Sequence, residues 1–217
     1  MTTMLRISQL MEPSEPSEGG AWGPHKVSEV VAATDSVGFF KEQGLFYQED
    51  ATVGAIVNAL DAQGLSGTNE GFKFFTGYLF GDARIRPILE PYLKHPNPQS
   101  SSIFSADPGH TFAFSTAPEE AGRVVIQVWS TGSRMEFYEK SHAKKLKGFL
   151  SANGLLEITR ASLKMNGCDS ISVRMDKGGI AILHPKLAFQ ILEGFTNTYG
   201  VQIPMVRQDD SESAKES

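Results

Sequence analysis

Histidine is the residue type in this chain whose spacing is most informative about chemistry, and there are five of them: His25, His95, His110, His142 and His184. The most compact metal-ligand signature is His-x-Asp or His-x-Glu on a strand, because alternation places both side chains on one face. No histidine here satisfies it, since the residues two positions further on are Val27, Asn97, Phe112, Lys144 and Lys186. The common zinc signatures HExxH and CxxC are also missing from the sequence. A metal site would therefore need histidines from separate elements.

Nucleophilic and nucleotide-binding signatures are equally scarce. Ser141 precedes His142, but no Gly-x-Ser-x-Gly elbow occurs, and the single cysteine, Cys168, lies in a turn-like Asn-Gly-Cys-Asp-Ser segment. No phosphate-binding GxxxxGK[ST] loop is present, and Gly178-Gly179 is typical of a hairpin turn. Covalent catalysis and nucleotide binding of the common kinds are therefore disfavoured.

Three histidines remain of interest because each adjoins a β-like run. His110 opens the run HTFAF, His142 follows SRMEFYEKS, and His184 lies between IAIL and a proline. Each alone is explained better by a structural or solvated role with local hydrogen bonds than by metal binding, whereas together, on three strands of one core, they form a pool of candidate metal ligands.

The bulk composition limits the partners of such a site. A chain of 217 residues with 40% apolar residues can bury one good core, and its net charge of −5 offers no basic surface for nucleic acid. One cysteine, no Asn-x-Ser/Thr sequon and no apolar run of about 18 residues predict a soluble cytoplasmic protein without a membrane partner.

The predicted secondary structure that must position the histidines changes from helical to β-rich along the chain. We expect a flexible segment at 1–25, a single domain at 26–207 that is helical over 26–93 and β-rich over 102–207, and a disordered acidic tail at 208–217. Gly44 and Gly64 lie where the first two helices should end. Helical patterns also run from Phe72 to Leu79 and from Ile85 to Tyr92.

Beyond a proline-containing break at 95–102, the signal becomes short β runs: SIFSA, HTFAFST, RVVIQVW, SRMEFYE, LEITRASLKM, SISVRM and GGIAIL. Strands of this length and spacing are typical of a sandwich, jelly roll or barrel. The nearly continuous apolar run at 124–129 should be buried on both faces. Residues 185–195 are predicted as a helix, with a strand as the alternative because 188–191 also alternates.

The order of these pieces over residues 110–189 resembles the double-stranded β-helix of the phytanoyl-CoA hydroxylase-like, or clavaminate-synthase-like, Fe(II)/2-oxoglutarate oxygenases. That family has an iron-binding His-x-Asp, a buried strand, a segment ending in Pro-Gly-Ser-His, and a Gly-Asp turn before the strand with the distal iron histidine. The corresponding pieces here are His110-Thr111-Phe112, residues 124–129, residues 132–142, and Gly178-Gly179 followed by residues 180–189.

The resemblance implies an α+β fold in which N-terminal helices pack on a C-terminal double-stranded β-helix, or jelly roll. It also implies Fe(II) and 2-oxoglutarate as cofactors and the oxidation of a small organic molecule, such as one of a biosynthetic pathway. The iron ligands would come from His110, His142 and His184, and Arg174 or Lys186 would hold a 2-oxoglutarate carboxylate.

Two residues depart from the family pattern. Phe112 stands where the carboxylate ligand is expected, and the distal histidine position falls at about Phe189. A phenyl ring cannot coordinate Fe(II). The alternative is therefore a metal-free protein of the same fold, serving as a small-molecule binding module or as an acid-base enzyme such as an isomerase or cyclase. A cupin-like isomerase or lyase is more distant, because its close His-x-His pattern is missing.

Overall fold

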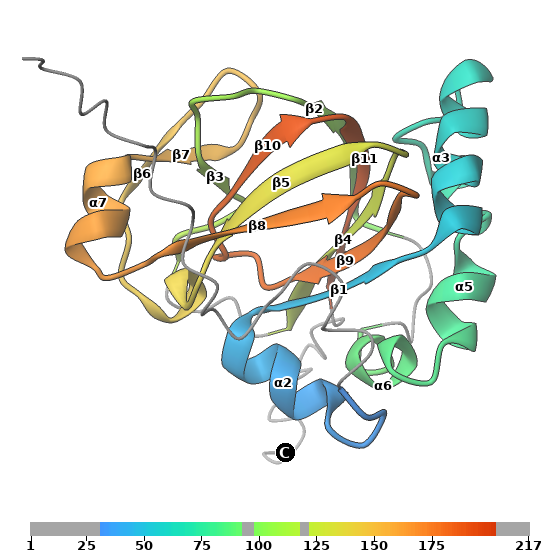
Figure 1. The fold of residues 1–217 in the computed structure, drawn as a ribbon, viewed down its shortest axis with the longest axis horizontal. Helices are drawn as coiled ribbons and strands as arrows, with labels where there is room; N and C mark the ends of the chain where they lie inside the picture. Colours follow the sequence, from blue (N-terminus) through green and yellow to red (C-terminus); the bar gives the residue numbers. More distant parts are fainter. Residues whose placement is uncertain (1–30, 93–97, 118–121, 203–217) are drawn as a thin grey trace, which may run out of the picture.

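The computed structural model describes residues 31–92, 98–117 and 122–202, and these residues form two antiparallel sheets with helices against them (Figure 1). The first sheet has five strands in the order β1-β9-β4-β11-β2. Its strands are β1 (Leu45–Glu49), β2 (Ser100–Ser105), β4 (Arg123–Trp129), β9 (Gly179–Leu183) and β11 (Phe195–Gln202). At its centre β4 is buried at every residue except Arg123, as its continuous apolar run predicts.

The second sheet has six strands in the order β6-β7-β3-β10-β5-β8. Its strands are β3 (Phe112–Ala113), β5 (Ser133–Tyr138), β6 (Gly148–Leu150), β7 (Leu156–Ile158), β8 (Ser170–Met175) and β10 (Phe189–Glu193). Consecutive strands alternate between the two sheets from β2 to β5 and again from β8 to β11. This alternation is that of a jelly roll, and the two facing sheets enclose the core.

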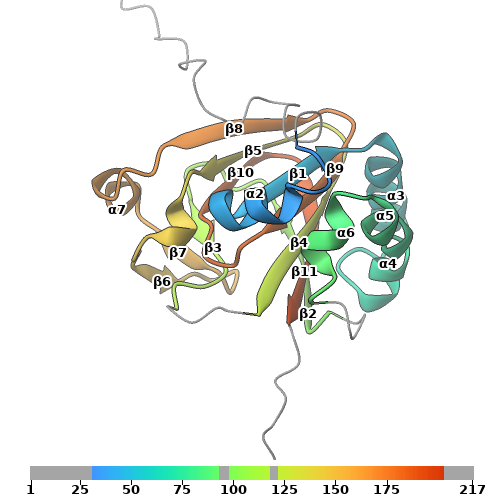
Figure 2. The same ribbon diagram turned by 90° about the horizontal axis from the view of Figure 1, so that it is seen from below.

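The helices lie mainly at one end of the molecule (Figures 1 and 2). They are α2 (Ser36–Gln43), α3 (Ala51–Ala62), α4 (Asn69–Lys73), α5 (Thr76–Gly81) and α6 (Ile85–Leu89), while η1 (Ser141–Ala143) and α7 (Arg160–Met165) follow later in the chain. Helix α3 contacts β4 and β9, and the ring centroids of Phe72 and Phe75 lie 4.8 and 6.4 Å from that of Tyr199 on β11. Helix α3 and the segment of α4 and α5 therefore cover the face of the five-stranded sheet that points away from the second sheet.

Several sequence predictions hold in the described residues. Helices end at Gly44, where φ is 73°, and just before Gly64, where φ is 70°. Strands form close to the predicted bounds in the runs that became β4, β5, β8 and β9. No helix in the described part of the chain is long and apolar enough to cross a membrane. The segments 1–25 and 208–217 lie outside the described residues.

Three predictions are wrong in detail. The region 26–93 is not all helical, because β1 separates α2 from α3 and pairs with β9. The run LEITRASLKM is strand only to Ile158, since the Thr159 hydroxyl accepts a hydrogen bond from the Ser162 amide and starts α7. The segment 185–195 is not a helix, because Phe189 and Gln190 pair with β5 on one side and β10 continues the sheet to β3. The strand alternative is confirmed.

Gly44 joins α2 to β1 at a point where no side chain fits. Its φ is left-handed, and a Cβ there would lie 2.5 Å from Nδ1 of His142. We expect Gly44→Ala to lower the free energy of unfolding by about 2–4 kcal/mol, from backbone strain and crowding together. Gly38→Ala is the control in the same helix: nothing lies within 4 Å of its Cβ, so the change should be neutral or stabilising. Equal effects in urea unfolding would contradict this account of the α2–β1 junction.

Candidate functional site

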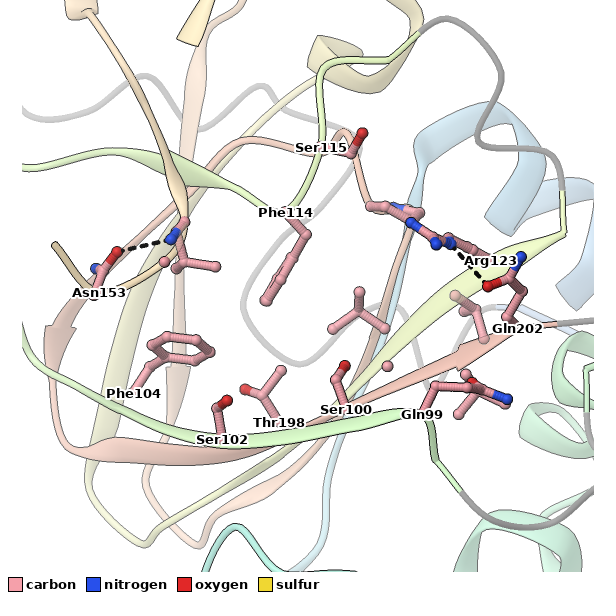
Figure 3. Close-up of a pocket in the computed structure, with 17 residues that line it drawn as sticks. Gln99, Ser100, Ser102, Phe104, Phe114, Ser115, Arg123, Asn153, Thr198 and Gln202 are labelled. Atoms are coloured by element: carbon pink, nitrogen blue, oxygen red, sulfur yellow. Dashed lines mark hydrogen bonds between the residues drawn. The ribbon is translucent and has the colours of Figure 1, made fainter. Parts of the chain in front are cut away.

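A cavity of about 460 Å³, which we term the main pocket, opens between the two sheets (Figure 3). This volume falls in the range usual for small-molecule sites. The five-stranded sheet supplies most of the wall through β2, β4 and β11, and the rest comes from residues after β3, from the β6–β7 loop and from Pro185. The described lining residues are Gln99, Ser100, Ser102, Phe104, Phe114, Ser115, Arg123, Val124, Val125, Asn153, Gly154, Leu155, Pro185, Thr198, Gly200, Val201 and Gln202.

One end of the main pocket is aromatic. The rings of Phe104 and Phe114 meet edge to face with centroids 6.0 Å apart, and Phe114 stacks on Phe189 at 5.3 Å and 17°. We term Phe104, Phe114 and Phe189 the phenyl stack. Phe189 is fully buried, whereas Phe104 and Phe114 are half-buried. The outer end of the stack is therefore the part that a ligand could contact.

A second cavity of about 270 Å³ lies beside the first and shares Phe104, Asn153 and Leu155 with it. Phe112 and Phe189 both line this second pocket, and they are register partners on β3 and β10. These are the two positions where the resemblance to the oxygenases expects a carboxylate and a histidine. Phenyl rings stand there instead, and both are buried.

Hydroxyl groups occupy the wall between the aromatic end and the mouth of the main pocket. Ser102 and Thr198 are register partners on β2 and β11, so they share one face of the sheet. Thr198 is only 4% exposed, and its Oγ1 has no hydrogen-bond partner in the part of the chain that the structure describes. Buried hydroxyls are normally paired, so Thr198 offers a hydrogen bond to whatever enters the pocket.

The charged group of the main pocket is Arg123, the first residue of β4. Its Nε donates a hydrogen bond of 3.1 Å to Oε1 of Gln202 on β11. Across the pocket, Oδ1 of Asn153 accepts from the Leu155 amide at 3.0 Å and shapes the β6–β7 loop. No other ionisable side chain is present among the described lining residues.

Deeper between the sheets, β4 carries two more polar side chains on the face of Val125. Gln127 pairs in register with Thr198, and Trp129 follows two residues on. Both amide atoms of Gln127 and Nε1 of Trp129 are buried without a hydrogen-bond partner among residues 31–92, 98–117 and 122–202. An unpaired buried amide costs stability, so this part of the interior is not optimised for folding alone.

The structure brings together His142 and His184, whose ring centroids lie 5.3 Å apart at the α2–β1 junction. His142 is buried, and its Nδ1 has no hydrogen-bond partner within the described residues. Burial and the nearby Lys186 charge lower the pKa of His142, and a hydrogen bond to the Lys41 backbone opposes them. The Lys186 amide donates to Nδ1 of His184 at 3.1 Å.

His110 is placed differently from the other two. It is exposed, and its Nδ1 lies 2.7 Å from Oδ1 of Asp107, a hydrogen bond and charge that raise the pKa of His110. Arg174 is also exposed and lies 3.7 Å from Asp176. None of His110, His142, His184, Arg174 or Lys186 is among the described residues that line either pocket.

These residues do not fit an iron site in this arrangement. No group of three or more His, Cys, Asp or Glu side chains that could hold a metal ion occurs in the described ranges. The assignment of His110, His142 and His184 as ligands, and of Arg174 and Lys186 as 2-oxoglutarate contacts, stays a prediction. The residues that do line the main pocket were not predicted, because they are ordinary Ser, Thr, Phe and Arg residues spread over three strands.

Comparison with known proteins concerns the fold. No family model matches the sequence, and no curated protein matches it significantly. Among solved structures, HygX from Streptomyces hygroscopicus with iron bound matches with a TM-score of 0.50 and 10% identity, over 79% of this chain and 87% of that one. The chain shares its fold with HygX.

Two further structures match less closely. SnoK, a non-heme alpha ketoglutarate dependent carbocyclase from nogalamycin biosynthesis, has a TM-score of 0.49 and 14% identity over 82% of this chain and 86% of that one. The non-heme monooxygenase ThoJ, in its nickel complex, has a TM-score of 0.42 and 14% identity over 79% and 78%.

Gln127 provides a test of whether the unpaired amide between the sheets lowers the stability of the folded protein. We expect Gln127→Met, which keeps the shape but removes the unpaired amide, to raise the free energy of unfolding by about 1–2 kcal/mol. Gln48→Met is the matched control, because Oε1 of Gln48 accepts a hydrogen bond of 2.9 Å from Arg84 and its loss should destabilise. A destabilised Gln127→Met in urea unfolding would show that the amide has a partner in the folded protein.

His142 should make the protein acid-sensitive. Because its pKa is lower in the folded than in the unfolded state, the stability it contributes is complete above the ordinary pKa of 6.5 and is lost as the pH falls toward the folded-state value. We expect wild type to lose more unfolding free energy than His142→Gln between about pH 7.5 and pH 5.5. His110→Gln is the control and should not reduce the loss, since the pKa of His110 shifts upward. Identical acid losses in wild type and His142→Gln would refute the assignment.

Proposed function

We propose that this protein binds a small organic molecule in the main pocket without a metal ion. The observation that carries the proposal is the phenyl ring at each expected ligand position, Phe112 and Phe189, both buried and both facing the second pocket beside the main one. A carboxylate and an imidazole are what Fe(II) requires there, and aromatic carbon supplies neither. At these two positions, phenyl rings therefore fill the space between the sheets that metal-ligating side chains would otherwise occupy.

The composition of the main pocket supports binding rather than acid-base catalysis. Its described lining contains no histidine, aspartate or glutamate, and a guanidinium stays protonated at ordinary pH. An isomerase or cyclase reaction would need a proton donor or acceptor beside its substrate. The hydroxyls and the single arginine are suited instead to fixing the orientation of a ligand.

The second candidate is an Fe(II)/2-oxoglutarate oxygenase acting on a small organic molecule. It is favoured by the fold shared with HygX, whose structure has iron bound. An activity that is inferred from a shared fold is an analogy. Here Phe112 and Phe189 occupy the expected ligand positions, and this argues against iron binding. For either candidate we propose a cytoplasmic protein whose partner is a small molecule rather than nucleic acid or a membrane, as the composition indicates.

Two ligand titrations separate the candidates. Anaerobic addition of Fe(II) with 2-oxoglutarate should leave the thermal midpoint of unfolding unchanged, whereas a ligand at about 100 times its Kd stabilises the folded state by about 2.7 kcal/mol. The fluorescent probe 8-anilinonaphthalene-1-sulfonate should bind the folded protein saturably at one site per chain. Stabilisation by Fe(II) with 2-oxoglutarate would overturn the metal-free proposal.

A pocket-filling variant locates the probe site. Ser102→Trp places a large ring in the main pocket opposite Thr198 and should abolish the saturable probe binding. Ser172→Trp is the matched control on β8, at an exposed position that lines no pocket described here. Probe binding that survives Ser102→Trp, or that is absent from the wild-type protein, would place the function elsewhere.

A further inference from the structure

We infer that the main pocket and the second pocket form one bipartite site, which takes a hydroxylated aromatic ring with an apolar side chain. The ring lies in the main pocket, and the side chain extends into the second pocket. This inference rests on the proposed function and adds the chemical class of the ligand. It is carried by the wall that the two cavities share, by the unpaired hydroxyl of Thr198 and by the apolar lining of the second pocket.

The phenyl stack is the wall that the two pockets have in common. Phe114 lines the main pocket, Phe189 lines the second pocket, and Phe104 lines both. Asn153 and Leu155 also line both cavities. The two cavities therefore adjoin at the half-buried ring of Phe104, and a ligand that contacts this ring from the main pocket lies next to the second pocket.

The phenyl stack also favours an aromatic ring in the main pocket. The half-buried rings of Phe104 and Phe114 lie at 70° to each other, so a ligand ring that stacks on one of them can meet the other edge to face. Aromatic pairs prefer these two arrangements, because the negative face of one ring attracts the positive edge of another. A saturated ring lacks this charge distribution and gains less from the same wall.

Thr198 offers a hydrogen bond to a hydroxyl on that ring. Its Oγ1 is buried without a partner in the described chain, and a hydroxyl can both donate and accept. Ser102 is its register partner on β2, and Phe104 follows Ser102 two residues further along the same face. Two residues of a strand span about 7 Å, which is close to the length of a phenol from its oxygen to a para substituent. A phenol that pairs with Thr198 can therefore reach Phe104 with its para substituent.

Figure 3 shows the same order along the main pocket. Phe104 and Asn153 lie toward one side, Gln202 lies toward the other, and Ser102 and Thr198 lie between them. Phe104 and Asn153 are two of the residues that the second pocket shares. The second pocket therefore adjoins the side of the main pocket toward which the para substituent points.

The second pocket is suited to an apolar side chain. Much of its lining is buried and apolar, from Phe112, Leu155, Phe189 and Ile191. Its ionisable lining residue is Asp107, whose side chain is exposed and lies 2.7 Å from Nδ1 of His110. A cavity of about 270 Å³ accommodates a short alkyl chain, and each methylene buried there should raise the affinity about fourfold.

A series of 4-alkylphenols tests the bipartite site by calorimetric titration of the folded protein. We expect the affinity to rise about fourfold with each methylene from 4-methylphenol to 4-butylphenol, because the growing chain enters the second pocket. The saturated analogue 4-butylcyclohexanol should bind about threefold to tenfold more weakly than 4-butylphenol, because it loses the aromatic contacts with the phenyl stack.

Two substitutions assign the two halves of the site. Ala106 is an exposed residue that lines the second pocket, so Ala106→Trp should abolish the rise with chain length while 4-methylphenol still binds. The smaller Ala106→Leu should reduce the rise in part. Thr198→Val keeps the side-chain shape and should weaken every phenol about threefold to tenfold with the rise unchanged. Ala161→Trp is the matched control, at an exposed position of α7 that lines no pocket described here, and its affinities should match wild type.

The outcomes distinguish this inference from the proposed function. If the fluorescent probe binds but the phenols do not, or if the rise with chain length is absent or survives Ala106→Trp, the bipartite site is wrong and the binding function stands. Equal affinities in wild type and Thr198→Val would overturn the pairing of the ligand hydroxyl with Thr198. If the probe does not bind the wild-type protein, the binding function itself fails. Because Ala106 is exposed and Thr198→Val removes an unpaired hydroxyl, these variants should remain folded, which thermal unfolding verifies.

Discussion

The antiparallel pairing of β4 with β9 on one side and β11 on the other is the constraint from which the rest of the site follows. The apolar run of β4 is buried on both faces, so its register is fixed by packing against the helices outside and the second sheet inside. Alternation then turns Val125, Gln127 and Trp129 inward, and the register with β11 sets Thr198 opposite Gln127. Arg123 lines the main pocket and is exposed, because β4 begins there and the side chain leaves the packed interior. A shift of one residue in this ladder would exchange the two faces and remove the polar wall.

The second sheet contributes phenyl rings at the two positions where the resemblance to the oxygenases expects iron ligands. Phe112 and Phe189 pair across β3 and β10, and Phe114 extends the contact to β2 through Phe104. Burying carboxylate and imidazole ligands without a metal ion leaves polar groups that need partners, whereas phenyl rings stabilise the same space by burial. Fold and site are separate properties, so the shared fold does not decide whether this interior binds a metal ion.

The sequence predicted those parts of the fold that depend on local pattern. The run 123–129 became β4 because its apolar residues are contiguous, and Gly44 ended α2 because only glycine adopts its φ readily. The helix predicted for segment 185–195 is wrong because its apolar residues fit both a helix and a strand pattern. The pairing with β5 makes part of this segment a strand, and a local pattern does not contain that information. The pocket was not predictable for the same reason. Ser102, Arg123 and Thr198 are distant in sequence and unremarkable in type, and only the order β4-β11-β2 brings them to one wall.

Unpaired polar atoms between the two sheets lower the stability of the fold, and this cost bears on the function of the main pocket. Gln127, Trp129 and Thr198 each bury a polar atom without a partner in the described chain, on one face of one sheet. Apolar residues of similar size are expected to fold more stably at these positions. The indole N–H of Trp129 can only donate a hydrogen bond and cannot coordinate a cation. Of these three residues Thr198 lines the main pocket, so its hydroxyl is the one that a ligand in the main pocket would reach. Under the proposed binding function, the hydroxyl of Thr198 and the rings of Phe104 and Phe114 are the groups that one ligand in the main pocket would contact together.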